Sequence, residues 1–292
     1  MKSAPFEYTR AVSVAEACAL LAREGDSAKL IAGGQSLVPM MAMRLVRPAW
    51  LIDINEIPEL KFVKIEKDAA RIGAGTRQCV VERDGALAAR VPLLRQALAW
   101  VGHAQTRNRG TLGGSLAHAD PSAELPLVAQ VLGAKMVLRS AKGTRTLDAE
   151  KFFSGPMSTS ARPDECLEEI RWPVWPEGPT GSAFTEIAIR HGDFAMVAAA
   201  AQVALAADGR CTRAVFGLGG AGGTPLAFPK IAARLVGTKL EHEVIEAAAV
   251  DAAKECDPGA DLHATKEYRR HLAGVLAARA LREARERAGA IR

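Results

Sequence analysis

The chain has 292 residues, enough for about two domains of ordinary size. Hydrophobic residues make up 49% of it and aromatic residues only 5%, so we expect an aliphatic core and no platform of exposed rings on which single-stranded nucleic acid could stack. The net charge of +5 is spread along the chain without a nucleic-acid recognition motif, which disfavours a nucleic-acid partner and leaves an anionic cofactor or a negatively charged partner surface open.

The cysteines are widely and irregularly spaced and form no Cys-x-x-Cys pair: Cys18, Cys79, Cys166, Cys211 and Cys256. This pattern disfavours an iron–sulfur or zinc site within the chain and predicts reduced, buried thiols. No apolar stretch of about 20 residues occurs, and the N-terminus lacks the apolar region of a secretory signal. We therefore expect a soluble, cytoplasmic protein with no bound metal and no membrane span.

The first part of the chain alternates predicted helices and strands. A helix is expected over 13–24, because Ser13 can cap its first amides, apolar residues recur at helical spacing and Gly25 can end it. The other helices are expected over 36–45, 78–89, 93–102 and 126–133, and the strands over 28–34, 50–54, 60–66, 69–76, 134–140 and 143–149. The segment 107–114 is expected to be a loop.

A Pro- and Gly-rich segment at 166–181 predicts a domain boundary near residue 176. Beyond it, the patterns predict antiparallel strands over 182–190 and 196–220 with a turn at Asp208-Gly209, and then helices over 229–237, 242–256 and 268–286. One face of the last helix should hold Tyr268, Leu272, Val275, Leu276 and Arg279. We thus expect an α/β domain over 1–176, with subdomains of about 1–57 and 58–176, followed by an α+β domain over 177–292.

Two short segments share a glycine doublet followed closely by Ser-Leu: AGGQSL at 32–37 and TLGGSL at 111–116. Glycine has no Cβ, so a ligand can approach the backbone closely, and successive amides at a strand-to-helix turn can hold an anion. In the first segment, Ser36 is expected to cap the helix that Leu37 begins. In the second, the amides of both glycines should be exposed between the hydroxyls of Thr111 and Ser115. Two such segments suit a ligand with two adjacent phosphates, although the spacing by itself equally allows two unrelated tight turns.

The binding free energy that these two segments could supply to an anion can be estimated. Hydrogen bonds to a charged group contribute roughly 1.5–3 kcal/mol each, so about five or six of them would give about 10 kcal/mol before costs. Immobilising a ligand costs about 4–15 kcal/mol. Both segments acting together would therefore suffice, whereas one doublet alone would fall short.

A third glycine motif has an ordinary structural interpretation. Gly217, Gly219 and Gly222 match G-x-G-x-x-G, but two prolines follow where a phosphate-binding helix should begin, and no acidic residue closes the motif about 20 residues later. We expect a glycine-rich strand end and loop here, and no dinucleotide site of the Rossmann type.

Several cationic or ionisable side chains flank the second doublet: His103, Arg107, Arg109 and His118. They would either balance the charge of a bound anion or belong to an ordinary solvated loop. His118 has the stronger claim to a role, because it lies inside the motif. No pair of carboxylates, no Ser-His-Asp set and no Cys-His set has a supporting local signature.

The motifs AGGQSLVPMMAMRL, LIDINEIPEL and QTRNRGTLGGSLAHADPSAELP resemble the flavoprotein, or medium, subunit of molybdenum-containing hydroxylases, the carbon monoxide dehydrogenase and xanthine dehydrogenase family. RIGAGT, IRHGDFAMVAAA and YRRHLAGVLAARAL resemble family segments in the same order, so the resemblance covers essentially the whole chain. It implies a noncovalent FAD in a two-part N-terminal domain of the vanillyl-alcohol-oxidase type. It also implies a C-terminal domain with a small antiparallel sheet and helices.

Carried over by position, the resemblance assigns residues to the cofactor. The FAD diphosphate should lie at 32–36 and 111–115, an acidic residue near the ribose, an apolar one beside a ring, and an Asp-Phe pair next to the isoalloxazine. The cofactor-binding residues implied in this way are Ala32, Gly33, Gly34, Gln35, Ser36, Leu37, Thr111, Gly113, Gly114, Ser115, His118, Asp120, Glu124, Leu167, Asp193 and Phe194. Gln35 and Ser115 vary within the family pattern and leave the function of the two segments intact.

The resemblance also implies a division of labour. A large partner subunit would hydroxylate the organic substrate at a molybdenum cofactor, and a small partner would pass electrons through two [2Fe–2S] clusters to the FAD of this chain. The FAD would then reduce an external acceptor, in an assembly expected to be a dimer of heterotrimers. The scarcity of cysteines agrees with this, and the absence of a Cys-rich insertion disfavours the branch that reduces hydroxybenzoyl-CoA. Two alternatives stay open: a self-sufficient flavin-dependent reductase on the same fold, and an assembly module without FAD, against which the intact glycines argue.

Overall fold

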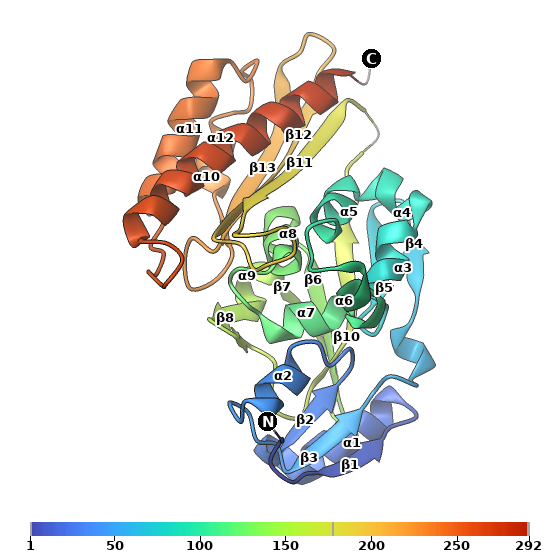
Figure 1. Cartoon of the computed structure of the whole chain (residues 1–292). Helices are drawn as coiled ribbons and strands as arrows, with labels where there is room; N and C mark the ends of the chain where they lie inside the picture. The colour runs from blue at the N-terminus through green and yellow to red at the C-terminus, as the bar shows by residue number, and fades with distance from the viewer. Residues whose placement is uncertain (1, 177, 291–292) are drawn as a thin grey trace.

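The computed structural model describes residues 2–176 and 178–290 and arranges them as three parts along one long axis (Figure 1). An N-terminal lobe lies at one end, a middle part follows, and the C-terminal part forms the other end. Within the described residues, no helix combines the length and the apolar character that crossing a membrane requires.

The N-terminal lobe is built on a small parallel sheet with the strand order β1-β3-β2. Its elements are β1 (Glu7–Arg10), α1 (Val14–Glu24), β2 (Ala28–Ile31), α2 (Leu37–Ala42) and β3 (Trp50–Asp53). The predicted ends of α1 are confirmed, because the Ser13 hydroxyl accepts a hydrogen bond from the Glu16 amide at 3.1 Å and Gly25 follows the helix with a φ of 58°. Strand β1 is an addition that the sequence pattern does not predict.

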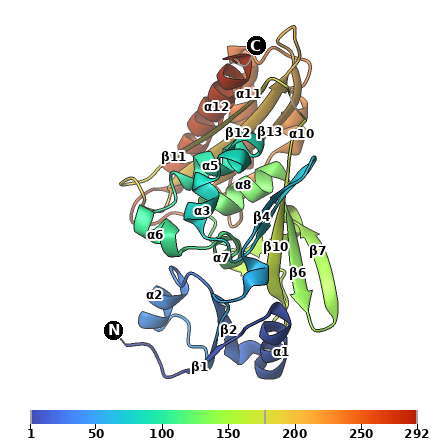
Figure 2. The ribbon, with the colours of Figure 1, turned by 90° about the vertical axis from the view of Figure 1, so that its right-hand side faces the viewer.

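The middle part contains a five-stranded antiparallel sheet with the order β4-β5-β10-β6-β7. Its strands are β4 (Val63–Ile65), β5 (Ala69–Gly73), β6 (Lys135–Ser140), β7 (Gly143–Asp148) and β10 (Cys166–Pro173). Helices gather on one face of this sheet (Figure 2): α3 (Gln78–Arg83), α4 (Gly85–Arg90), α5 (Pro92–Leu98), α6 (Ala104–Arg109), α7 (Leu112–His118) and α8 (Glu124–Leu132). A short helix and a hairpin follow β7: α9 (Ala149–Phe152), β8 (Phe153–Gly155) and β9 (Ser158–Thr159).

Some local predictions for the middle part are wrong. The segment 78–89 forms two helices, because the Asp84 side chain accepts a hydrogen bond from the Leu87 amide at 2.9 Å and so caps α4. The segment 107–114 is not a loop, since it holds the end of α6 and the start of α7. The Pro- and Gly-rich segment begins with β10, the central strand, whose Ile170 and Trp172 are fully buried. The domain boundary near residue 176, just beyond that strand, stays a prediction.

The C-terminal part is an antiparallel sheet with the order β11-β12-β13-β14. Its elements are β11 (Thr180–Ile187), β12 (Val197–Leu205), β13 (Cys211–Gly219), β14 (Leu226–Ala227), α10 (Pro229–Ala233), α11 (His242–Glu255) and α12 (Lys266–Ala290). The predicted Asp208-Gly209 turn joins β12 to β13, with Gly209 at a φ of 82°. Helix α12 packs on one face of the sheet, while α5 and α8 of the middle part pack on the other (Figure 2). The predicted order, α/β first and antiparallel α+β second, is confirmed.

The buried face of α12 differs from the predicted one. Leu272 and Leu276 are buried as expected, whereas Tyr268, Val275 and Arg279 are exposed. Most of the contact is made by alanines, and their small side chains let the helix lie directly on the sheet. A Cβ on Gly181 of β11 would stand only 2.0 Å from the carbonyl oxygen of Ala284. Because the helix lies so close to the sheet, its buried face consists mainly of small side chains and not of the larger ones that the sequence pattern predicts.

Candidate functional site

A cavity of about 740 Å³ lies where the three parts of the chain meet. Its wall is formed by the segment that joins β2 to α2, by α7 and the start of α8, by the beginning of β10, and by the loop after β11. All the residues that the resemblance assigns to the cofactor border this cavity: Ala32, Gly33, Gly34, Gln35, Ser36, Leu37, Thr111, Gly113, Gly114, Ser115, His118, Asp120, Glu124, Leu167, Asp193 and Phe194. The fold therefore gathers segments that are far apart in the sequence around one space.

The first glycine segment presents a row of free backbone donors. Gly34 has a φ of 70°, which turns the chain after β2, and the amides of residues 33–37 have no hydrogen-bond partner within the described part of the chain. The prediction that Ser36 caps α2 is wrong. Ser36 has helical dihedral angles, φ −101° and ψ −48°, whereas a capping residue needs an extended backbone to aim its side chain at the helix amides. The free amides of this segment remain available to an anion in the cavity.

The second glycine segment is built differently. The Gly113 amide donates to the Ala74 carbonyl at 2.8 Å, and the Gly114 amide donates to the Thr111 hydroxyl at 3.0 Å. The expectation that both of these amides are exposed is therefore wrong, because the doublet forms the first turn of α7 and its amides are capped from within the protein. The hydroxyls of Thr111 and Ser115 still border the cavity, and that of Ser115 has no partner among the described residues.

Gly113 also explains how α7 approaches the sheet. A Cβ at this position would lie 2.4 Å from the Cβ of Ala74 and 2.7 Å from its carbonyl oxygen. A larger residue would push α7 away from Ala74, just after β5, and with it the Thr111 and Ser115 hydroxyls. Gly113 thus positions the cavity wall through packing, while its amide stays occupied.

The first glycine segment contacts the residues just before the second, at Arg109 and Gly110, and side chains that sequence reasoning missed tie the two together. The Asn55 amide donates to the Ala32 carbonyl at 2.8 Å, and Asn55 Oδ1 accepts a hydrogen bond from Arg77 at 2.7 Å. Arg77 also donates to the Arg109 carbonyl, directly before the second segment. Asn55 lies inside the motif LIDINEIPEL, two residues after the end of the buried strand β3. Its place in this motif could have marked it as a candidate site residue. Nothing local marks Arg77, since its role depends on contacts between distant segments.

The cavity wall also contains a buried acid and an exposed ring. Glu124 begins α8 with only 8% of its surface exposed, and burial together with the charge of Asp120 raises its pKa to about 7. Leu167 of β10 is buried against the wall. In the loop after β11, Asp193 forms an ion pair with Arg190 at 3.1 Å, and Phe194 is 70% exposed at the cavity edge. An exposed phenyl ring at this edge can pack against a flat ligand.

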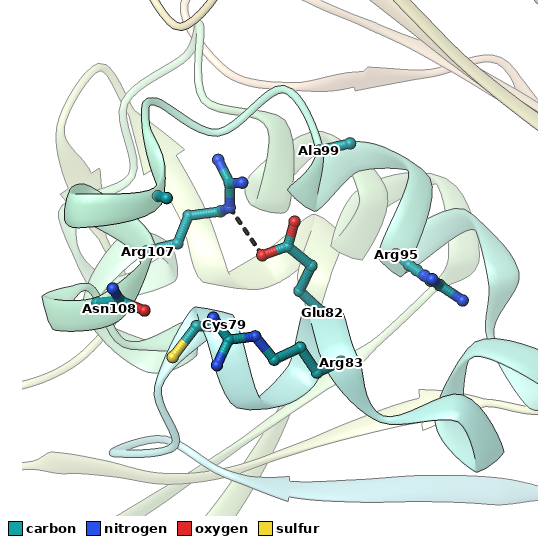
Figure 3. Close-up of a pocket in the computed structure, with 8 residues that line it drawn as sticks. Cys79, Glu82, Arg83, Arg95, Ala99, Arg107 and Asn108 are labelled. Atoms are coloured by element: carbon teal, nitrogen blue, oxygen red, sulfur yellow. Dashed lines mark hydrogen bonds and ion pairs between the residues drawn. The ribbon is translucent and has the colours of Figure 1, made fainter.

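The cationic or ionisable side chains that flank the second doublet do not all border the cavity. Arg107 faces a separate hollow of about 520 Å³ between α3, α5 and α6, where its Nε donates to Glu82 at 2.8 Å (Figure 3). It also donates to the carbonyls of Val101 and Gly102, so it holds the turn before α6. Of the flanking set, only His118 borders the cavity.

The G-x-G-x-x-G motif has the predicted ordinary role. Gly217 and Gly219 lie within the antiparallel strand β13, and no phosphate-binding helix follows them. A Cβ on Gly217 would come within 2.2 Å of the Leu226 carbonyl oxygen, so this glycine serves the pairing of β13 with β14.

Comparisons with known proteins cover almost the whole chain. Residues 4–175 match the family described as the FAD binding domain in molybdopterin dehydrogenase, and residues 182–284 match the CO dehydrogenase flavoprotein C-terminal domain. The chain is 39% identical to the 6-hydroxypseudooxynicotine dehydrogenase complex subunit alpha of Paenarthrobacter nicotinovorans, over 99% of this chain and 97% of that protein. It is also 39% identical to the caffeine dehydrogenase subunit beta of Pseudomonas sp. (strain CBB1), over 98% and 97%.

Among solved structures, the carbon monoxide dehydrogenase of Hydrogenophaga pseudoflava superposes with a TM-score of 0.95 at 37% identity, covering 98% of this chain and 99% of that one. The likeness confirms the predicted fold, a FAD-binding domain followed by a C-terminal α+β domain. The chain belongs to the family of FAD-binding medium subunits of molybdenum hydroxylases, a family of oxidoreductase subunits.

Proposed function

We propose that this chain is the electron-transfer flavoprotein subunit of a molybdenum hydroxylase complex, in which it passes electrons from [2Fe–2S] clusters of a small partner through FAD to an external acceptor. The observation that carries the proposal is the cavity between the three parts of the chain, with the free amides of residues 33–37 in its wall. Its volume of about 740 Å³ falls within the range of about 300–1,000 Å³ that is typical of ligand and cofactor sites.

The residues present fit FAD. The amides of 33–37 would hold the diphosphate, helped by the hydroxyls of Thr111 and Ser115, and about five such bonds would give about 10 kcal/mol before costs. Apolar wall residues such as Leu167 and Met157 suit the ring systems, and Glu124 would lie near the ribose. Asp193 and Phe194 would border the isoalloxazine, where the exposed phenyl ring can shield one face.

Bound FAD supplies the redox chemistry, because it can take up electrons singly and release them as a pair. The side chains of this chain bind and orient the cofactor and keep water from it. No side chain of the cavity is assigned as an acid or base on the organic substrate, which would be transformed at the molybdenum cofactor of a large partner subunit. The related proteins carry names such as complex subunit alpha and subunit beta, which supports an assembly of several subunits. We propose that these include a small and a large partner, in a dimer of heterotrimers.

The proposal also includes a domain boundary near residue 176 and a location in the cytoplasm. Residues 4–175 and 182–284 match two separate families, which supports a boundary near residue 176. All the cysteines, Cys18, Cys79, Cys166, Cys211 and Cys256, are free, and this supports a reducing compartment such as the cytoplasm.

The test is expression of the full chain alone and together with iron–sulfur and molybdenum partner subunits. We expect the chain to carry about one FAD, visible in its absorbance spectrum, and to be reduced rapidly only within the assembled complex when organic substrate is added. Failure to bind added FAD would overturn the assignment of the cavity. Rapid reduction of the isolated chain by a nicotinamide cofactor, coupled to turnover of a small organic substrate, would instead favour the self-sufficient reductase.

A further inference from the structure

Glu186 is a buried carboxylic acid without a partner. It lies on β11 with 5% of its surface exposed, and neither of its carboxylate oxygens forms a hydrogen bond within the described part of the chain. Glu165 and Glu169 are similarly buried, but each accepts hydrogen bonds from an arginine. A buried charge without a partner is costly, so Glu186 needs either a proton or a ligand.

The strand geometry shows where Glu186 points. Side chains alternate along β11, and Ala183 and Ile187 pack with α12, whereas Phe184 belongs to the core of the middle part. Glu186 therefore faces the middle part, between the two domains. Glu186 lies opposite Ala198 of β12, and helix α8 packs on β12 from the side of the middle part, with Glu124 as its first residue and in the cavity wall. The charge of Glu124 acts on Glu186.

The other ionisable groups near this interface do not neutralise Glu186. They are Asp120 before α8, Arg95 on α5, His191 in the loop after β11, Arg213 at the opposite end of the sheet and, on α12, the buried Arg269. Asp120 adds negative charge to Glu124, Arg95 and His191 are exposed, Arg213 lies over the Trp175 ring, and Arg269 is paired with Asp261 at 2.6 Å and donates to the Met196 carbonyl. Two negative carboxylates would thus lie in buried surroundings, and neither forms an ion pair among the described residues.

Burial and a neighbouring negative charge act in the same direction on both carboxyl groups. Burial, with the added charge of Glu124, raises the pKa of Glu186 to about 8, and burial with the charge of Asp120 raises that of Glu124. When two carboxyl groups interact in this way, their protons are held by the pair rather than by either residue.

We propose that Glu124 and Glu186 form a proton-holding carboxyl pair between the two domains, and that an anionic cofactor entering the cavity draws a proton from solvent onto this pair. The second half of the proposal rests on the proposed function, because the negative charge would be that of the FAD diphosphate. A negative charge near Glu124 favours its neutral form, so cofactor binding and proton uptake become linked.

The first test needs no cofactor. Urea unfolding of the cofactor-free full chain is followed from about pH 5 to about pH 8, for the wild type, for Glu186→Gln and for Glu243→Gln, an exposed control on α11. The folded wild type holds protons that the unfolded chain releases, so its folded-to-unfolded ratio should fall as pH rises, by up to about tenfold per pH unit for each proton. The decline should be weaker in Glu186→Gln and unchanged in the control. An unchanged decline in Glu186→Gln would overturn the pair.

An infrared measurement covers the case in which Glu186→Gln fails to fold. The carbonyl band of a protonated carboxylic acid should persist in the folded wild type at about pH 7, far above the usual titration range of glutamate. Its absence there would overturn the pair as well.

The second test measures the link to the cofactor. The cofactor-free chain is titrated with FAD by calorimetry at about pH 7.5, in two buffers with different ionisation heats. The wild type and Glu243→Gln should take up a proton on binding, whereas Glu124→Gln, which removes the member of the pair that borders the cavity, should bind FAD with much less proton uptake. Binding with equal heats in both buffers would overturn the link. Absence of FAD binding in every variant would overturn the proposed function too, while the unfolding test would still decide whether the pair holds a proton.

Discussion

Gly33 lies directly against the backbone of Arg109: a Cβ on Gly33 would stand 2.5 Å from the Arg109 carbonyl oxygen and 2.8 Å from the Cα of Gly110. The N-terminal lobe and the middle part therefore meet backbone to backbone at one wall of the cavity. This glycine serves contact between two protein segments, and the donors offered to a ligand are the amides of the same loop. The first glycine doublet is thus part of the contact between the N-terminal lobe and the middle part.

Replacing Gly33 by alanine should disrupt its close contact with the backbone of Arg109 and Gly110. The added methyl group would meet backbone atoms, which cannot rotate away, so we expect the loop to shift and the free energy of unfolding to fall by about 1–3 kcal/mol. The shift would misplace the amides of residues 33–37 and weaken FAD binding by about tenfold or more, equivalent to about 1.4 kcal/mol. Urea unfolding and titration with FAD measure the two effects.

Gly85→Ala is the matched control. A Cβ at Gly85, in the first turn of α4, meets nothing within 4 Å, so the change should be neutral or stabilise the fold by up to about 1 kcal/mol. Equal losses of FAD affinity in Gly33→Ala and Gly85→Ala would contradict the proposed contact.

Asn55→Ala should loosen the first glycine segment without a steric clash. The change would leave the Ala32 carbonyl and one Arg77 donor without their partner, at a cost of about 1–3 kcal/mol in unfolding free energy. We expect weaker FAD binding and faster hydrogen exchange of the amides in 33–37. Asn108→Ala, at an exposed asparagine without a hydrogen bond in the described part of the chain, should change neither quantity. The network would be refuted if both variants bound FAD as tightly as the wild type.

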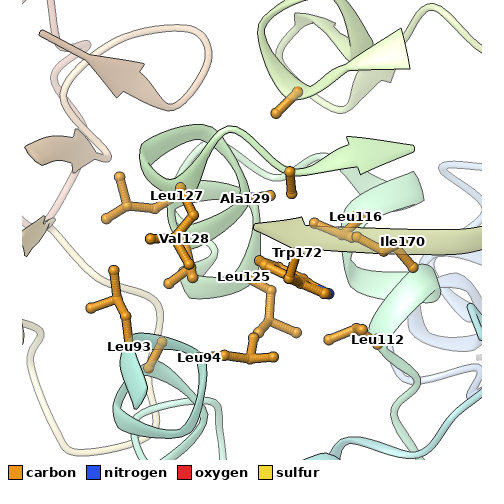
Figure 4. Packing of buried hydrophobic residues seen from close by; sticks show 14 of the residues in the cluster. Leu93, Leu94, Leu112, Leu116, Leu125, Leu127, Val128, Ala129, Ile170 and Trp172 are labelled. Atoms are coloured by element: carbon orange, nitrogen blue, oxygen red, sulfur yellow. The ribbon is translucent and has the colours of Figure 1, made fainter. Parts of the chain in front are cut away.

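Many residues of the candidate site could be predicted, because they cluster in short motifs. The backbone conformation of these motifs could not be predicted. The second doublet was expected in a loop because glycine is a poor helix former. Leu112 and Leu116, both fully buried against the core around Trp172, nevertheless hold this segment as a helix (Figure 4). Tertiary packing therefore overrides local propensity, and it also places the Thr111 cap that occupies the Gly114 amide.

Strand β10 was hidden by the composition around it. The prolines of 166–181 indicate a linker, yet Pro173 ends the strand, where a missing N–H is easily tolerated. The burial of the strand, which does not alternate strictly because the register shifts between Leu167 and Glu169, is clear only once its partners β5 and β6 are known. Pairings such as that of Arg77 with Asn55 depend in the same way on segments distant in the sequence, and local patterns carry no information about them.

Thr111→Val should remove the cap of α7 while it preserves the shape of a side chain that is only 2% exposed. Loss of the hydrogen bond to the Gly114 amide should lower the unfolding free energy by about 1 kcal/mol. Hydrogen exchange at Gly114 should accelerate, and FAD affinity should fall, because the hydroxyl also borders the cavity. Thr111→Ser keeps the hydroxyl and should stay close to the wild type in exchange rate. Equally fast exchange in both variants would show that the cap contributes little.

Glu169→Gln should change the acid stability of the central sheet. Burial alone would raise the pKa of Glu169, but hydrogen bonds from Arg71, at 2.5 and 2.8 Å, and from Arg171, at 2.6 Å, outweigh it and lower the pKa. Because the folded pKa lies below the unfolded one, this stabilisation is complete above about pH 4.5 and is lost as the pH falls through the folded value.

We expect Glu169→Gln to lower the free energy of unfolding by about 3 kcal/mol at about pH 7 and to converge with the wild type in acid. Glu168→Gln, whose partner Arg139 is 46% exposed, should lose less than about 1 kcal/mol. Urea unfolding across this pH range measures both, and a constant difference between Glu169→Gln and the wild type at every pH would contradict the ionic origin of the effect.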